Sequence, residues 1–113
     1  MSFSTHVLDA VRGGPASAVP LVLRVAGPSG WQLLAAGVTD ADGRYRYSDQ
    51  DGSETFPAGR YRVEFDTGAY HSASGQIGFY PEVSITFEVT DPAAHHHVPL
   101  LLSPFAYSTY RGS

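Results

Sequence analysis

The stretch Val83-Ser84-Ile85-Thr86-Phe87-Glu88-Val89-Thr90 alternates apolar and polar side chains over its whole length. Because successive side chains of a β-strand point to opposite faces, this pattern predicts a strand with one face on a core and the other in solvent. Residues 60–66 repeat the alternation, with Tyr61, Val63 and Phe65 on the apolar face. Both segments are therefore predicted to be half-buried strands.

Glycine, proline and aspartate separate further predicted strands, at intervals of about 8–12 residues that are typical of a β-sandwich or barrel. The mostly apolar runs 19–26 and 31–39 are divided by a Gly-Pro-Ser-Gly turn at 27–30. The dipeptide Asp42-Gly43 predicts a tight turn into residues 44–47, where arginine and tyrosine alternate. These segments add three strands to the prediction.

The remaining segments are less regular. A second Asp-Gly dipeptide at 51–52 predicts another turn, inside a stretch, 49–58, that we expect to be irregular. Residues 98–102 form an apolar run in which Pro99 indicates an edge or a bulge, because proline cannot donate to a β-ladder. Residues 67–74 are the one candidate helix, of two turns at most. The sequence therefore predicts an all-β fold with one short helix.

Composition excludes several classes of function. The chain has 113 residues, which predicts a single domain over residues 1–113. It contains no cysteine and no lysine, so thiol nucleophiles, Schiff-base lysines and lysine-dependent phosphate loops are excluded. Its net charge of −4 and its lack of a basic patch argue against nucleic acid as a partner. Its apolar runs are too short to span a bilayer, and we expect no membrane partner.

The first residues carry neither the basic region nor the apolar region of a secretion signal, so we expect a cytoplasmic protein. The opposite end, residues 103–113, is rich in aromatic side chains. Chain ends usually fray, and a fraying tail is more often polar. This tail is therefore predicted to dock on the domain.

Five histidines are candidates for chemistry, and three of them form the run His95-His96-His97. On a strand, His95 and His97 share one face and His96 points to the other. Imidazole binds zinc, nickel and copper, so a metal site is one interpretation. The other is a polar strand entrance where one histidine matters and its neighbours are solvated. The spacing alone leaves both open.

Several separated motifs, taken in order, resemble those of the transthyretin-like proteins. The first is Ser4-Thr5-His6-Val7-Leu8-Asp9, and the second is Val38-Thr39-Asp40-Ala41-Asp42-Gly43-Arg44. The third runs from His97-Val98-Pro99 into Leu100-Leu101-Leu102-Ser103-Pro104. The chain ends in Tyr110-Arg111-Gly112-Ser113, which is similar to the ending of the 5-hydroxyisourate hydrolase branch. Ala106 departs from the family, where glycine is usual.

The resemblance implies a two-sheet β-sandwich with a short helix, assembled as a homotetramer, a dimer of dimers. It implies an enzyme of urate degradation that opens the six-membered ring of 5-hydroxyisourate and yields 2-oxo-4-hydroxy-4-carboxy-5-ureidoimidazoline. The active sites would lie in the cleft between the two dimers. The catalytic residues that carry over are His6, Arg44, His97 and Ser113, and the substrate-binding residues are His6, Arg44, Tyr110 and Arg111.

These residue types suit the hydrolysis of a cyclic amide. A neutral histidine, with an ordinary pKa of about 6.5, accepts a proton from water near neutral pH. Arginine stays charged and offers a planar set of donors to carbonyl oxygens and to a developing oxyanion. We expect no metal and no cofactor, and the sequence does not choose between His6 and His97 as the base.

Two alternatives belong to other classes. A transthyretin-type carrier would bind small aromatic ligands in the same channel without turnover, and its channel should lack the paired histidines, the arginine and the terminal motif. A metal-binding sandwich would use the histidine run, and metal content after chelation would reveal it.

Overall fold

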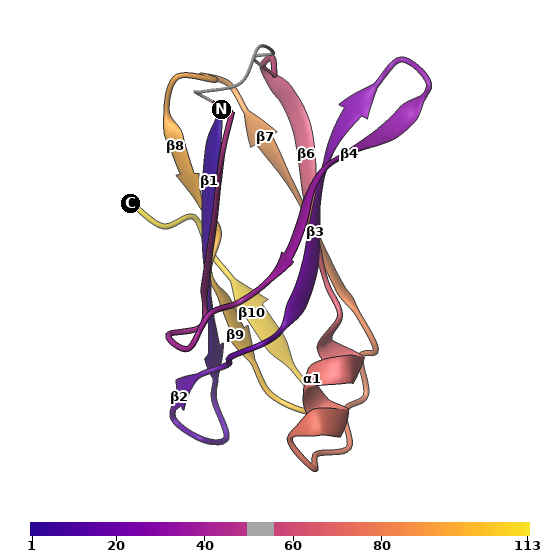
Figure 1. Ribbon diagram of the computed structural model, residues 1–113, viewed down its shortest axis with the longest axis vertical. Coiled ribbons are helices and arrows are strands. Elements are labelled where there is room, and N and C mark those ends of the chain that lie inside the picture. The colour runs from indigo at the N-terminus through magenta and orange to yellow at the C-terminus, as the bar shows by residue number, and fades with distance from the viewer. Residues whose placement is uncertain (50–55) are drawn as a thin grey trace.

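The computed structural model describes residues 1–49 and 56–113, which form two sheets packed face to face (Figure 1). In the first sheet β1 (Ser2–Asp9) is central. One side of β1 pairs with β5 (Arg44–Ser48) and, at its end, with β2 (Gly14–Pro15), both antiparallel. The other side pairs in parallel with β8 (His95–His97) and β9 (Leu100–Leu102).

The last strand, β10 (Tyr107–Thr109), pairs antiparallel with β9 and forms the edge of this sheet. At Pro99, where the sequence predicts an edge or a bulge, the structure has a gap between two strands, since β8 ends at His97 and β9 begins at Leu100. The carbonyl of Pro99 accepts a hydrogen bond from Thr109 Oγ1 at 2.7 Å. The aromatic-rich tail is therefore docked, as its composition predicts.

The second sheet has the antiparallel order β4 (Gly30–Val38), β3 (Pro20–Gly27), β6 (Gly59–Phe65) and β7 (Val83–Val89). These bounds confirm the strands that alternation predicts. The turn before β5 is also confirmed: Gly43 has a φ of 77° and its N–H donates to the carbonyl of Asp40 at 2.9 Å. The predicted turn at 51–52 and most of the irregular stretch 49–58 lie outside the described residues.

The helix α1 (Thr67–Ala73) follows β6 and closes one end of the sandwich (Figure 1). Asp66 caps it, because its carboxylate accepts from the Ala69 N–H at 3.0 Å. Thr67, Tyr70 and His71 are its buried residues, at the i, i+3 and i+4 spacing of one helical face. The described residues contain no helix that is long and apolar enough to cross a membrane.

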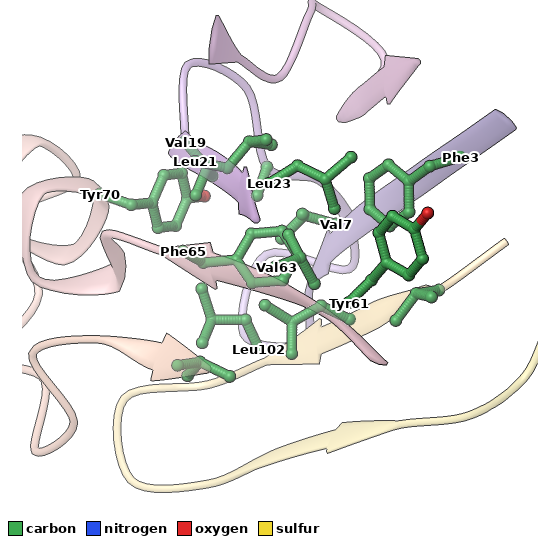
Figure 2. Packing of buried hydrophobic residues seen from close by; sticks show 14 of the residues in the cluster. Phe3, Val7, Val19, Leu21, Leu23, Tyr61, Val63, Phe65, Tyr70 and Leu102 are labelled. Carbon is green, nitrogen blue, oxygen red and sulfur yellow. The ribbon is translucent and has the colours of Figure 1, made fainter. Parts of the chain in front are cut away.

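The core fills the space between the two sheets (Figure 2). Its side chains come from alternate positions of the strands, which is why the alternating segments predict it. Fully buried examples are Phe3, Leu23, Tyr61, Val63 and Phe65. The opposite faces of β1, β5 and β8 are left for polar residues. The all-β, two-sheet sandwich with one short helix is confirmed.

Candidate active site

His6 and Arg44 lie directly opposite each other in the antiparallel pair β1–β5. Arg44 is exposed and His6 is half-buried. Nε2 of His6 is 2.9 Å from the carbonyl oxygen of Asp42. Because a carbonyl oxygen only accepts, this nitrogen carries the proton and Nδ1 keeps the lone pair. A lone pair is thus available beside a guanidinium.

His97 reaches the same face from the other side of β1, where β8 runs parallel and Ser4 is its register partner. Ser4 and His6 are two residues apart on β1, so both point away from the core. An open hollow of about 480 Å³ adjoins this area and includes Ser4, Arg44 and Arg46 in its lining. We call the outward side chains of Ser4, His6, Arg44, His95 and His97 the histidine face.

Serine hydroxyls hold the two outward histidines of β8. Ser4 Oγ is 2.8 Å from Nδ1 of His97 and 2.7 Å from Nε2 of His95. Ser2 Oγ is 2.7 Å from Nδ1 of His95. Among the hydrogen bonds of the described residues, none uses Nε2 of His97. That nitrogen is therefore the one that His97 presents to a substrate.

The pKa values of both outward histidines on β8 are lower than usual. Burial is the largest cause at His97, and the positive charges of Arg44 and His6 lower its pKa further, against a hydrogen bond with the Ser4 backbone. Burial also lowers the pKa of His95, with help from Arg46 and the neighbouring histidines. Both rings are consequently neutral at neutral pH, the state a base requires.

The tail passes directly over His97. The Gly112 N–H donates to the His97 carbonyl at 2.9 Å, and a Cβ at position 112 would lie 2.3 Å from Cδ2 of the ring. Only glycine permits this approach. Tyr110 and Arg111 line a pocket of about 290 Å³ beside His97. Its lining also includes His96 and, from β7, Ile85, Phe87 and Glu88. Ser113 follows Gly112 and is exposed.

The predicted site residues thus fall into two groups that meet at His97. His6, Arg44 and His97 share the histidine face, whereas Tyr110 and Arg111 lie on the side of His97 that faces β7. No hydrogen bond or ring contact of the described residues joins this tail to His6 or Arg44. Within one chain the site is open.

Two features of the histidine run differ from expectation or were missed. His96 is not solvated: it is 6% exposed and its ring lies 6.4 Å from that of Phe87, because the middle residue of the run points into the sandwich. Sequence reasoning gave Ser4 no role and considered His95 only as a possible metal ligand. Their link depends on the parallel pairing of β1 with β8, which no local pattern indicates.

A metal interpretation of the run finds little support in the geometry. In the described ranges 1–49 and 56–113, no three histidine, aspartate or glutamate side chains converge as a metal site needs. Both ring nitrogens of His95 and one of His97 face serine hydroxyls instead.

Known proteins resemble this chain over almost its whole length. The model of the HIUase/Transthyretin family matches residues 3–112. The chain belongs to this family. A 5-hydroxyisourate hydrolase of Salmonella dublin is 42% identical over 110 residues, which cover 97% of this chain and 79% of that protein.

Solved structures of the family agree with the fold. A 5-hydroxyisourate hydrolase of Klebsiella pneumoniae superposes with a TM-score of 0.83 at 37% identity and covers 100% of both chains. Sea bream transthyretin, solved in complex with thyroxine, superposes with a TM-score of 0.85 at 38% identity, covering 97% of this chain and 93% of that one. The backbone is therefore equally similar to a hydrolase and to a thyroxine-binding protein. The side chains of the site must distinguish the two functions.

Proposed function

We propose that this protein is a hydrolase of urate degradation that opens the ring of 5-hydroxyisourate. The observation that carries the proposal is the convergence of His6, Arg44 and His97 on one outward face. A carrier of aromatic ligands has no need of two histidines beside an arginine on this face. The relatives named as hydrolases of this substrate support the same reading.

His97 is the proposed general base. Its Nδ1 faces Ser4 and its pKa is lowered by burial and by Arg44 and His6, so Nε2 holds a lone pair at neutral pH. A water molecule gives its proton to this nitrogen as it attacks the ring carbonyl. His6, with its lone pair at Nδ1, orients the substrate or the water from the neighbouring strand. The same His97 nitrogen later returns the proton to the leaving ring nitrogen.

Arg44 is proposed to bind the carbonyl groups of the substrate and to stabilise the oxyanion that forms. One well-placed donor of this kind contributes about 3–4 kcal/mol to the transition state. Tyr110 and Arg111 contact the substrate edge from the tail, and the Ser113 hydroxyl or carboxylate positions the water. These roles need no metal or cofactor. Prolonged chelation should therefore leave the rate unchanged, whereas loss restored by one equivalent of metal would contradict this part.

We further propose that residues 1–113 form a single domain and that four copies of the chain assemble as a homotetramer, a dimer of dimers. The strand β7 is one edge of the second sheet, and β10 is one edge of the first. Phe79 precedes β7 and Phe105 precedes β10, and their side chains are 70% and 72% exposed, so a partner chain at these edges would bury them. In a two-fold assembly a cleft draws residues from two chains, which would close the open site. Light scattering tests the oligomeric state. Cell fractionation tests the proposed cytoplasmic location.

The deciding experiment generates 5-hydroxyisourate from urate and follows its ultraviolet decay. Because this compound also decays spontaneously, the rate without protein is the control. We expect clear acceleration at catalytic protein concentration. Binding of the substrate with no acceleration would favour the carrier, to which the likeness to transthyretin points.

A further inference from the structure

The outward residues of β1 and β8 form an unbroken chain of hydrogen bonds. His97 Nδ1, Ser4 Oγ and His95 Nε2 are joined at 2.8 Å and 2.7 Å, and His95 Nδ1 continues to Ser2 Oγ at 2.7 Å. Every member both donates and accepts: a neutral imidazole has one donor and one acceptor nitrogen, and a hydroxyl does both. All hydrogen bonds of such a chain can point one way or the other, so two arrangements of its protons are self-consistent.

In one direction His97 Nδ1–H donates to Ser4, Ser4 donates to His95 Nε2, and His95 Nδ1–H donates to Ser2. Nε2 of His97 then carries a lone pair, as a base requires. In the other direction every donor becomes an acceptor, and Nε2 of His97 carries a proton, as an acid requires. The two directions differ only by one proton taken up at Nε2 and one released at the far end.

From this arrangement we propose that His97, Ser4 and His95 act as a proton relay, in which His95 is a positioning residue for the hydrolysis proposed above. When water attacks, Nε2 of His97 takes its proton, Nδ1 passes its own to Ser4, and Ser4 passes its own to Nε2 of His95. His95 is exposed and releases a proton from Nδ1 to solvent, whereas Ser2 is 6% exposed and keeps its own hydroxyl proton. The new bond joins the water oxygen to the ring carbonyl carbon.

The relay runs backward when the ring C–N bond breaks. Nε2 of His97 gives its proton to the leaving nitrogen, and the chain takes one proton back from solvent at His95. Protons and charges therefore balance over one turnover, and both serines end as neutral hydroxyls. No other reactant is needed.

The charges around His97 explain why a relay helps. Arg44 and His6 face His97 from β5 and β1, and Arg46 faces His95 from β5. A full imidazolium at His97 would stand beside the guanidinium of Arg44, which disfavours it. Passing a proton onward lets His97 receive one without becoming a cation.

The test compares His95→Ala and Ser4→Ala with two matched controls. Ser72→Ala removes an exposed serine of α1, and Ser84→Ala removes an exposed serine of the second sheet. We expect kcat to fall about 5- to 20-fold in both relay variants, with little change in KM, since proton-transfer effects at a group that does not touch substrate lie at the low end of acid–base contributions. Both controls should keep the rate of the unmodified protein.

Two further readouts distinguish a relay from a merely structural role. The rate is measured in mixtures of H₂O and D₂O. For the unmodified enzyme, a plot of rate against deuterium fraction should be curved, because several protons move together. For His95→Ala the plot should be a straight line. Added imidazole should restore part of the lost rate of His95→Ala. It should not change the rate of the control Ser84→Ala. A His95→Ala enzyme with full rate, or with an unchanged curve, would overturn the relay.

Failure of the relay is distinguishable from failure of the proposed function. If the unmodified protein does not accelerate the decay of 5-hydroxyisourate, the function is wrong. If it does, and His97→Ala abolishes the acceleration while His95→Ala leaves it intact, only the relay is wrong.

Discussion

Two histidines of the sandwich, His71 on α1 and His97 on β8, each have a glycine packed against the ring. A Cβ at Gly78 would lie 2.3 Å from Cδ2 of His71, and a Cβ at Gly112 would lie 2.3 Å from Cδ2 of His97. The surroundings differ. His71 is 2% exposed and its Nδ1 lies 3.0 Å from Oε1 of Gln76, whereas His97 is half-buried and no hydrogen bond of the described residues uses its Nε2.

The two ends of the molecule therefore use the same residue types for different purposes. At the helix end, Tyr70 donates from its hydroxyl to Oδ2 of Asp9 at 2.6 Å, and both groups are buried. Partners within the fold bind the Tyr70 hydroxyl, the Asp9 carboxylate and Nδ1 of His71, which stabilises the structure. On the histidine face, by contrast, Nε2 of His97, Nδ1 of His6 and the guanidinium of Arg44 stay available to a ligand. Changes at the first end should alter stability, and changes at the second should alter rate.

The largest expected effect is on the histidine face. His6→Ala, Arg44→Ala and His97→Ala should each lower kcat/KM about 100-fold or more, equivalent to about 2.7 kcal/mol, while the folded state persists. Decay of 5-hydroxyisourate measures the rate and circular dichroism the fold. Arg60→Ala is the matched control, since Arg60 is an exposed arginine of the other sheet. Near-normal rates in any two of the three would place the site elsewhere.

Gly78→Ala tests the helix end and should act on stability. The added methyl group meets a buried ring that its bond to Gln76 holds in place, so we expect a loss of about 1–3 kcal/mol. Thermal denaturation should show a lower Tm, by about 4–8 °C for each kcal/mol in a domain of this size. The rate per folded molecule should not change.

Gly14→Ala is the control for that substitution, because a Cβ at Gly14 would meet no atom within 4 Å and the backbone there is not left-handed. Equal Tm values for the two variants would show that the His71 contact is not tight. A loss of rate in Gly78→Ala at unchanged Tm would contradict the division between the two ends.

These two ends also show how far sequence reasoning reaches. Alternation in residues 83–90 and 60–66 predicts the strands β7 and β6, because burial of one face follows from a period of two. The catalytic candidates come from a motif resemblance, which carries residue types but no distances. The link from Ser4 to His95 and the contact of Gly112 with His97 join residues far apart in the chain. Register between distant strands is set by packing of the whole domain, so no local pattern contains it.

The tail should have an intermediate effect. Deleting residues 110–113, or adding a short tag after Ser113, should lower kcat/KM at least about tenfold, equivalent to about 1.4 kcal/mol, because Tyr110 and Arg111 line the pocket beside His97. The same tag before Met1 is the control and should do less harm. Light scattering must show the same assembly in all forms. Full activity of the truncated protein would make the tail an ordinary docked end.

Gly112→Ala is the counterpart of Gly78→Ala, because each adds a methyl group against a histidine ring. The ring of His97 is half-buried and can swing away from a new methyl group, so the substitution should displace the base rather than unfold the protein. We expect kcat to fall by up to about tenfold with a Tm change under about 2 °C, which is a small effect for a domain of this size. A large drop in Tm with unchanged kcat would reverse the assignment of the two glycines.

The smallest expected effect is that of Tyr70→Phe, which removes a buried hydroxyl and should cost about 1 kcal/mol. Burial raises the pKa of Asp9, but the hydrogen bonds from Tyr70 and from the N–H groups of Arg12 and Val11 together bring it below its ordinary 3.8. A lowered folded-state pKa stabilises the protein above the unfolded value, and this contribution is lost as pH falls through the folded one. The difference in unfolding free energy between Tyr70→Phe and the unmodified protein should therefore be full at pH 7 and shrink below about pH 4. Urea denaturation at pH 7 and at pH 3 measures it, and a difference that stays constant would mean that the hydroxyl acts through packing and not through the carboxylate.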